Sequence, residues 1–287
     1  MGARQFRAFR GGPDMNAAVT NAPSPFVVSV NLDVETIDAA NAGAAGIFGR
    51  YSYGRYGARE GVWRLLEVFD RHAVKASVFI SADDARRHGA LIEAIMREGH
   101  EIALQASPVS AQAPRGPAAL DALAADAESL AAVTGERPRG FRATNGLLTR
   151  EALVALAELG FVYDSSFQDD DAPYVFDTGG GRALVELPVF DYLTDSTFYA
   201  GRHTPDRAEI AFREEAQAQA RAGGYIHLTL HSRGDIGSAR AVRAAVVDRL
   251  LAHAAADPGF ALMSIGDLCA TVGVEARPEP IPDWGAL

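Results

Sequence analysis

Two side chains able to exchange protons stand where apolar runs of the sequence end. Asp33 closes the run P-F-V-V-S-V-N-L-D, and His231 closes Y-I-H-L-T-L-H. A carboxylate and an imidazole are the usual general base and general acid of hydrolytic sites. Because each follows a run typical of a buried strand, we expect the two to meet at one rim of a parallel sheet.

Two further polar residues lie toward the ends of strand-like runs. Gln105 belongs to E-I-A-L-Q-A, and Arg142 belongs to G-F-R-A-T. A buried guanidinium needs a carboxylate, because an unpaired buried charge is costly, and Asp33 is the natural partner. Structural roles are the alternative: Asp33 could cap the following loop, and His231 could be a hydrogen-bonded core histidine. His227, two residues earlier, shares its strand face.

Strand-like and helix-like segments alternate along the chain and must position these residues. The strand candidates are 26–33, 75–81, 101–106, 140–144, 161–165, 225–232 and 260–264. The helix candidates are 59–73, 83–99, 118–134, 149–159, 206–222 and 238–256. This alternation predicts an α/β protein with a parallel sheet and outer helices. Polar residues at strand ends favour a barrel of about seven units; an open, doubly wound sheet is the alternative.

Two stretches break the alternation. Residues 34–58 are predicted to be one long loop, and loops of that length inside a compact domain are usually functional or disordered. The part at 47–57 carries Tyr51, Tyr53 and Tyr56 among glycines. It could cover a substrate, meet a second subunit or be a plain exposed loop. Residues 166–204 form an insertion with an acidic run and the hairpin-like A-L-V-E-L-P-V-F-D-Y.

Composition limits the class of protein. The chain has 287 residues, 48% of them hydrophobic, so it can bury a sizeable core. A formal charge of -10 argues against nucleic acid and anionic membrane as partners. No apolar run approaches the ~20 residues of a membrane span, and the lone Cys269 is expected to be a buried, inert thiol. We expect a cytoplasmic protein with a disordered leader (1–24), one domain (25–272) and a C-terminal tail (273–287).

Several longer motifs together resemble a known family. They are V-N-L-D-V-E, Y-G-A-R-E-G-V-W-R-L-L-E-V-F, E-G-H-E-I-A-L, T-G-E-R-P-R-G-F-R-A and H-L-T-L-H. From about residue 26 to 270 the chain resembles the polysaccharide deacetylases of the NodB-homology type, carbohydrate esterase family 4. Y-D-S-S-F-Q-D-D-D-A-P-Y is most similar to the branch with cofactor-free allantoinase, cyclic imidases and peptidoglycan-deacetylase-like proteins. The resemblance implies a distorted (β/α)7 barrel.

The resemblance also implies a metal site that this chain has lost. The family's first motif supplies a base and a metal ligand, here Asp33 and Glu35. Its second motif, His-x-x-x-His, supplies two more ligands, and those positions hold Gln105 and Val109. Valine cannot bind a metal, and a glutamine amide binds zinc poorly. We therefore expect no metal and no other cofactor.

Other family roles fall on matching residues. The third motif's arginine, which positions the base, matches Arg142. The fifth motif's leucine and histidine match Leu230 and His231, and that histidine is the family's general acid. Asp195 matches the acidic residue that tunes the histidine.

Two functions are compatible with this sequence. The first is a hydrolase of non-peptide C–N bonds, acting without a metal on an amide, cyclic imide or ureide, with Asp33, Arg142 and His231 as catalytic residues. The substrate-binding candidates are Glu35, Gln105, Asn145, Asp195 and Tyr53. The alternative is an inactive deacetylase homologue that binds a glycan or small ligand. We expect a small-molecule or glycan ligand and, as the resemblance implies, a homo-oligomer.

Overall fold

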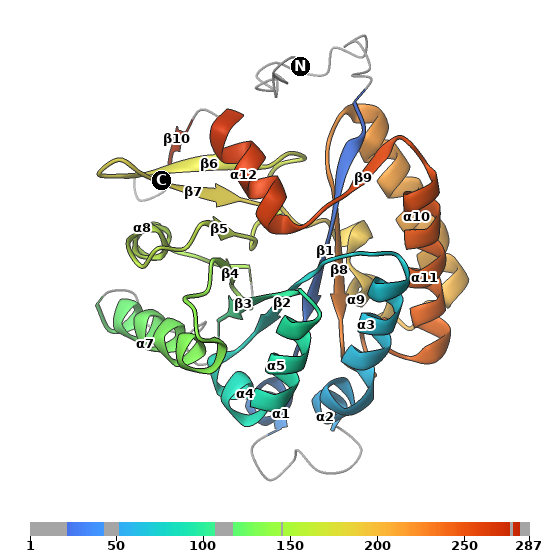
Figure 1. The fold of residues 1–287 in the computed structure, drawn as a ribbon, viewed down its shortest axis with the longest axis horizontal. Coiled ribbons are helices and arrows are strands. Elements are labelled where there is room, and N and C mark those ends of the chain that lie inside the picture. Colours follow the sequence, from blue (N-terminus) through green and yellow to red (C-terminus); the bar gives the residue numbers. More distant parts are fainter. Residues whose placement is uncertain (1–21, 43–51, 107–116, 145, 276–277, 282–287) are drawn as a thin grey trace.

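The computed structural model describes residues 22–42, 52–106, 117–144, 146–275 and 278–281, which form one mostly parallel sheet with helices around it (Figure 1). The strands are β1 (Ser24–Asn31), β2 (Ser77–Ile80), β3 (Glu101–Gln105), β4 (Gly140–Arg142), β5 (Tyr163–Asp164), β6 (Tyr174–Gly179), β7 (Arg182–Glu186), β8 (Ile226–His231), β9 (Phe260–Leu262) and β10 (Glu279–Pro280). The helices are α1 (Glu35–Ala42), α2 (Tyr53–Tyr56), the π-helix η2 (Gly57–Gly61), α3 (Val62–Arg71), α4 (Ala82–Arg87), α5 (Gly89–Arg97), α7 (Pro117–Thr134), α8 (Arg150–Glu158), the 3₁₀-helix η3 (Asp191–Leu193), α9 (Asp195–Tyr199), α10 (Pro205–Ala222), α11 (Ala241–Ala256) and α12 (Ile265–Glu275).

The strand order is that of a barrel. It runs β10-β6-β7-β5-β4-β3-β2-β1-β8, with β9 also paired to β1. From β1 to β5 each strand adds on the same side of the one before, and β8 returns to the free side of β1. A doubly wound sheet instead divides into two halves that wind in opposite directions. The prediction of a barrel-type α/β fold is confirmed.

The barrel is incompletely closed. Within the described ranges no hydrogen-bonded ladder joins β8 to β7. Helix α12 contacts β1 on one side and β6 and β7 on the other, and Figure 1 shows it lying between them. Helix α12 thus lies beside the gap in the barrel wall.

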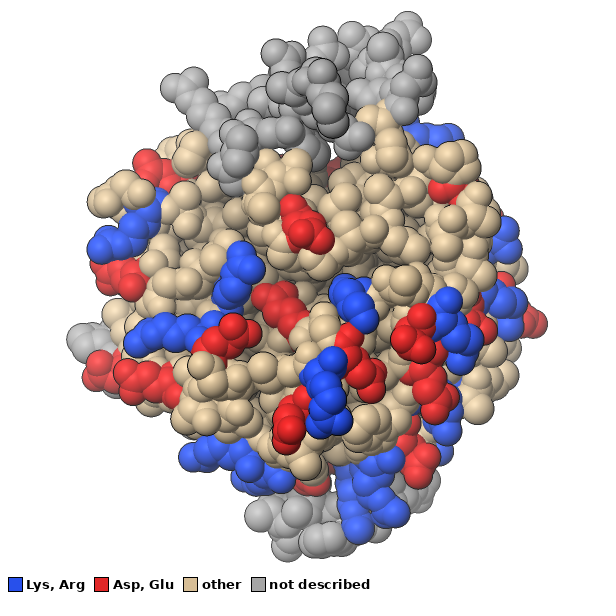
Figure 2. Space-filling view, in the orientation of Figure 1, with Lys and Arg blue, Asp and Glu red and all other residues tan. Residues whose placement is uncertain are grey.

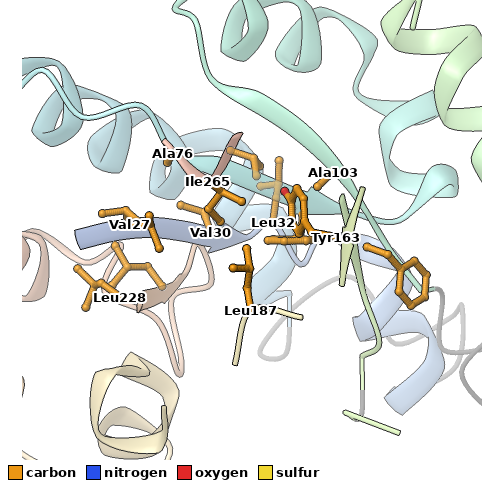
Figure 3. Packing of buried hydrophobic residues seen from close by; sticks show 14 of the residues in the cluster. Val27, Val30, Leu32, Ala76, Ala103, Tyr163, Leu187, Leu228 and Ile265 are labelled. Carbon is orange, nitrogen blue, oxygen red and sulfur yellow. The ribbon is translucent and has the colours of Figure 1, made fainter. Parts of the chain in front are cut away.

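The core lies between this sheet and the helices outside it. Parallel strands covered on both faces are apolar on both faces, and Val27, Val30 and Leu32 are each at most 1% exposed. Figure 3 shows these residues close to Tyr163 and Leu228, which come from strands far away in sequence. The apolar face predicted for the helix at 59–73 is also buried. The apolar runs of the sequence therefore build one continuous core.

All seven predicted strands are present, each with boundaries within two residues of the prediction. The hairpin predicted in the insertion is β6–β7, an antiparallel pair beside β5. The prediction of a single helix at 83–99 is wrong at one point. Two helices, α4 and α5, meet there at His88, whose backbone is not helical (φ -118°, ψ 34°). Cys269 is buried, and burial raises the pKa of its thiol, as expected for an inert cysteine.

The prediction of one long loop over 34–58 is wrong where the structure describes it. Helix α1 begins directly after the first strand, and α2, η2 and α3 follow one another from Tyr53 to Arg71. The glycines explain this, because a Cβ at Gly54 would overlap the Val34 carbonyl, and one at Gly61 would overlap the Ser232 carbonyl. These glycines let a helix lie directly on the strand ends.

Tyr56, from the predicted cover or contact segment, is held by its own chain. Its hydroxyl donates to the Ala239 carbonyl (3.1 Å) and accepts from Arg64 (2.8 Å), and the Arg240 guanidinium lies 4.0 Å from the ring centre. Residues 47–51 lie outside the described residues. A role of this segment over a substrate or between subunits stays a prediction.

Charges of both signs are mixed over the face seen in Figure 2. Within the described ranges, no helix has both the length and the apolar character needed to span a bilayer. The predicted domain limits stay predictions, since residues 1–21 and 282–287 lie outside the described residues.

Candidate functional site

The carboxyl ends of β1, β4 and β8 meet around a cavity of about 510 Å³. Its lining includes Asn31, Arg142 and His231, the last residues of those strands. Asn31 and His231 are direct partners in the β1–β8 register. Arg142 and His231, predicted from separate parts of the chain, are therefore brought together at the rim where barrel enzymes hold their sites.

His231 is held by Asp195 at the start of α9. Its Nδ1 lies 2.6 Å from Asp195 Oδ1, while Asp195 Oδ2 accepts from the backbone N–H groups of His231 (2.9 Å) and Ser238 (2.7 Å). A carboxylate only accepts, so Nδ1 carries a hydrogen and Nε2 is the atom that can exchange a proton. Burial lowers the pKa of His231, but Asp195 and then Asp33 more than offset this, and the pKa is raised overall.

Asn31 lies between His231 and Arg142, and the sequence reasoning missed it. Its Nδ2 is 3.0 Å from His231 Nε2, and its Oδ1 accepts from Arg142 Nη1 at 2.8 Å. The residue was overlooked because it lies inside an apolar run, two positions before Asp33. The alternation S-V-N-L-D could have revealed Asn31, because it places Ser29, Asn31 and Asp33 on one strand face.

Arg142 is fully engaged by neutral groups. Its Nε donates to Ser165 O (2.8 Å), Nη1 to Ser29 Oγ (3.1 Å) and Asn31 Oδ1 (2.8 Å), and Nη2 to Ser165 Oγ (2.8 Å) and His227 Nε2 (3.5 Å). The predicted ion pair with Asp33 is wrong, because these partners occupy the guanidinium and the described residues provide no ion pair to it. Burial lowers the pKa of Arg142 to about 10, so it remains a cation at neutral pH.

Two buried acids, Asp164 and Glu186, face each other in the β5–β7 register, and both favour the cationic form of Arg142. Ser166 Oγ donates to Asp164 Oδ1 (2.6 Å), and the backbone N–H groups of Ser166 and Phe167 donate to Glu186 Oε1 (3.2 and 3.0 Å). Their other oxygens have no further partner in the described part of the chain. Burial raises the pKa of Asp164 to about 6 and that of Glu186 well above its usual value. Burial and the closeness of the two acids therefore favour the protonated form of each.

Asp33, Gln105 and Glu35 lie beside the cavity without lining it. Asp33 Oδ1 accepts from Gln105 Nε2 at 3.1 Å, and both side chains are buried. Glu35 Oε2 lies 2.7 Å from His88 Nε2 at the start of α1. The predicted base thus contacts an amide, and the predicted metal ligand contacts the histidine between α4 and α5.

These residues do not fit a zinc ion. Gln105 points an N–H at Asp33, where a metal ligand would have to present a lone pair. A catalytic zinc normally has three protein ligands, and the described residues contain no group of three histidine, cysteine or acidic side chains able to hold a metal. Val109 lies outside the described residues. We derive no step through a metal.

The remaining predicted residues differ in their relation to the cavity. The Tyr53 ring lies 5.8 Å from Arg233 Cζ and outside the cavity lining. Asn145 lies outside the described residues, although its neighbours Thr144 and Gly146 line the cavity. His227 is buried below the site, with Nε2 2.9 Å from Ser29 Oγ, and burial lowers its pKa well below the usual value. Roles for these residues stay predictions.

Comparisons with known proteins agree with this architecture. The family model described as polysaccharide deacetylase matches residues 53–163, less than half of the chain. A homologue of these enzymes from Mycobacterium smegmatis has a crystal structure that superposes with a TM-score of 0.82 at 28% identity, covering 93% of this chain and 96% of the other. The chain is thus similar to polysaccharide deacetylases in part of its sequence and in its fold. The model match contains Gln105 and Arg142 but neither Asn31 nor His231.

Two more similarities define the extent of the relationship. The peptidoglycan deacetylase-like protein FGM2 of Gibberella zeae is 34% identical over 154 residues, which are 50% of this chain and 42% of FGM2. The match therefore spans less than half of that relative. The structure of Puue allantoinase superposes with a TM-score of 0.75 at 20% identity, covering 88% of this chain and 91% of the other, which is a likeness of fold.

Proposed function

We propose that this protein is a hydrolase of non-peptide C–N bonds and that His231 is the group that moves the proton. The observation that carries the proposal is the His231–Asp195 pair, because His231 also lines a polar cavity at the strand ends. An imidazole oriented by a carboxylate is a recurrent means of activating a nucleophile. The relationship to polysaccharide deacetylases supports the same class of reaction.

The reaction we propose needs one water and one C–N bond. His231 Nε2 takes a proton from the water as its oxygen attacks the carbonyl carbon. The same proton then passes to the leaving nitrogen as the C–N bond breaks, which yields an acid and an amine. The Asn31 amide, 3.0 Å from Nε2, lies close enough to donate to the developing oxyanion.

Asp33 is our second candidate for the base. It is buried, and it raises the pKa of His231. Because it does not line the cavity, water would have to reach it past Gln105. We therefore give Asp33 the supporting role of stabilising a proton on His231, and Gln105 the role of holding Asp33.

We further propose that the substrate is small and activated. The donor set around Asp33 and Gln105 does not suit zinc, and a metal would otherwise supply several kcal/mol of charge stabilisation. A strained cyclic imide or a ureide tolerates that loss better than the acetamide of a sugar. The site thus favours such substrates over chitin or peptidoglycan.

The test is a turnover screen with purified protein. Acetylated sugars, cyclic imides and ureides are incubated with and without a chelator, and release of amine or acid is measured. Chelator-resistant turnover of an imide or ureide, lost in His231→Ala, is the expected result. Turnover of acetylated sugars that depends on added zinc would refute the metal-free proposal.

A second function is favoured by one observation. Asn31, not a carboxylate, occupies the position facing Arg142, and an amide cannot take a proton from water. The resemblance implies that Arg142 positions the base, matched here to Asp33, but Asp33 contacts Gln105 instead. The chain would then be an inactive homologue that binds a glycan or small ligand. Calorimetric binding of a screened compound without turnover would establish it.

A further inference from the structure

We propose that Asn31 sets the resting protonation state of His231 by keeping Nε2 free of a proton, so that the imidazole begins a reaction as a base. The protonation state stands independently of any activity, whereas its use in catalysis rests on the proposed function. Asn31 acts through His231 and is in that sense a positioning residue.

The orientation of the Asn31 amide is fixed by Arg142. A guanidinium has only donors, so the amide oxygen must face it, as the 2.8 Å contact between Arg142 Nη1 and Asn31 Oδ1 requires. The amide nitrogen then faces His231 Nε2 at 3.0 Å. Turning the amide over would set its N–H groups against those of Arg142, a buried residue whose other contacts hold it in place.

The other side of the imidazole imposes the same tautomer. Asp195 accepts from Nδ1, so the neutral ring carries its hydrogen there and presents a lone pair at Nε2. The Asn31 N–H is the matching donor for that lone pair. Donor and acceptor thus alternate without conflict from Arg142 through Asn31 and His231 to Asp195.

A second proton on His231 would break this series of hydrogen bonds at one point. Nε2–H and the Asn31 N–H would then be two donors face to face, and one hydrogen bond would be lost. The negative charges of Asp195 on α9 and Asp33 after β1 favour the protonated ring. The positive charge of Arg142 on β4 disfavours it. Asp191 of η3 lines the same cavity. Asn31 disfavours the protonated ring and so opposes the effect of the carboxylates on His231.

The test is an NMR titration of the histidine rings in the full chain. Imidazole ¹⁵N shifts report the tautomer and the titration midpoint, and His231→Gln assigns the signal. At pH 8 wild-type His231 should be the Nδ1–H tautomer. In Asn31→Ala the midpoint should rise by about one pH unit, the worth of one hydrogen bond. Asn31→Asp should raise it further, because a carboxylate accepts from Nε2–H.

Ser29→Ala is the matched control, since Ser29 contacts Arg142 from the same strand face without touching His231. Its midpoint should equal that of the wild type. An Nε2–H tautomer in the wild type, an unchanged or lower midpoint in folded Asn31→Ala, or an equal rise in Ser29→Ala would overturn the proposal. If Asn31→Ala does not fold, Asn31→Asp decides alone.

A pH–rate profile adds a second readout once a substrate is known. With His231 starting as a base, kcat/KM should fall as pH drops through its titration midpoint. A loss of kcat/KM as pH rises through that midpoint would mean that the ring starts as an acid, against the proposal. A protein without turnover leaves the NMR result intact, so the two proposals fail separately.

Discussion

His231 is the side chain on which the proposed chemistry depends. His231→Ala should lower kcat/KM by roughly 10²–10⁴-fold on any substrate that the protein hydrolyses, the usual contribution of a positioned acid or base. The measurement is initial rate against substrate concentration at pH 8, with folding checked by circular dichroism. His72→Ala is the control, because that partly exposed histidine pairs with Asp248 on α11, outside the cavity lining. Equal rates for both variants would move the site elsewhere.

Asp33→Asn separates the two candidate bases. If Asp33 only stabilises the proton on His231, the variant keeps most of its maximal rate, and the midpoint of its pH profile falls, because a charge that raises the pKa of His231 is gone. If Asp33 itself takes the proton from water, the rate is lost at every pH. The pH–rate profile of this one variant therefore assigns the base.

Single residues were predictable where chemistry and position agree in the local sequence. Arg142 and His231 were found because each lies toward the end of a strand-like run, and the structure brings both to one cavity. The partner of Arg142 was not predictable, since its contacts come from β1, β8 and the residues after β5. Asn31 gains its importance only from the β1–β8 register, which joins positions 200 residues apart.

The pairing of β5 with β7 should leave a signature in stability against pH. Asp164 and Glu186 have raised pKa values in the folded protein, so their contribution is fully present below about pH 4, the usual carboxyl pKa. This contribution to stability declines as pH rises through about 6, where Asp164 titrates. It declines further above that pH because the pKa of Glu186 is raised more strongly. The urea concentration at the midpoint of unfolding of the wild type should therefore decrease as pH rises from 5 to 8.

Glu186→Gln removes a carboxyl group whose pKa is raised, while its amide can still donate to Asp164. The slope of unfolding free energy against pH should become less steep. The change should be at most that of one bound proton, roughly 1.4 kcal/mol per pH unit. Glu158→Gln, at an exposed acid on α8, should keep the wild-type slope. Parallel slopes for wild type and Glu186→Gln would show that the pair holds no proton.

The helix from Tyr53 to Arg71 depends on its glycines. Gly61→Ala should lower the free energy of unfolding by about 1–3 kcal/mol, because the new methyl overlaps the Ser232 carbonyl, which is backbone. Gly89→Ala, in α5 with no atom near its Cβ position, should raise it by about 0.5–1 kcal/mol. Urea denaturation of both variants is the measurement, and a neutral Gly61→Ala would mean that the helix can shift outward.

Elements were predictable where hydrophobic periodicity is strong. The seven strands and the long helices follow directly from apolar runs and helical spacing. The helical residues 53–58 were predicted to belong to a loop, and glycine is intrinsically a poor helix former. The reason for glycine there is contact with Val34 and Ser232, which no local pattern reveals.

The whole protein should be isolated without stoichiometric zinc. Gln105 donates to Asp33, and too few ligands remain around that pair. Elemental analysis of protein purified without chelator is the measurement, and Gln105→His is the informative variant. Tight zinc in the wild type would show that residues outside those described complete a metal site.

We also expect a homo-oligomer, which light scattering of the full chain at several concentrations can measure. A single species at the mass of one chain, 30.4 kDa, would contradict this expectation. The result bears on the segment around Tyr51, whose role between subunits stays a prediction.

Strand β1 acquires its second neighbour very late. Phe26 of β1 pairs with Ile226 of β8, whereas β2 covers only the other edge of β1. At a synthesis rate of roughly 5–20 residues per second, β1 leaves the ribosome about 10–40 s before β8. During that interval an apolar strand edge stands open, and such edges attract other chains. Nascent chains that stall before β8 are therefore the form most prone to aggregate, and a cell making this protein has to shelter them until β8 emerges.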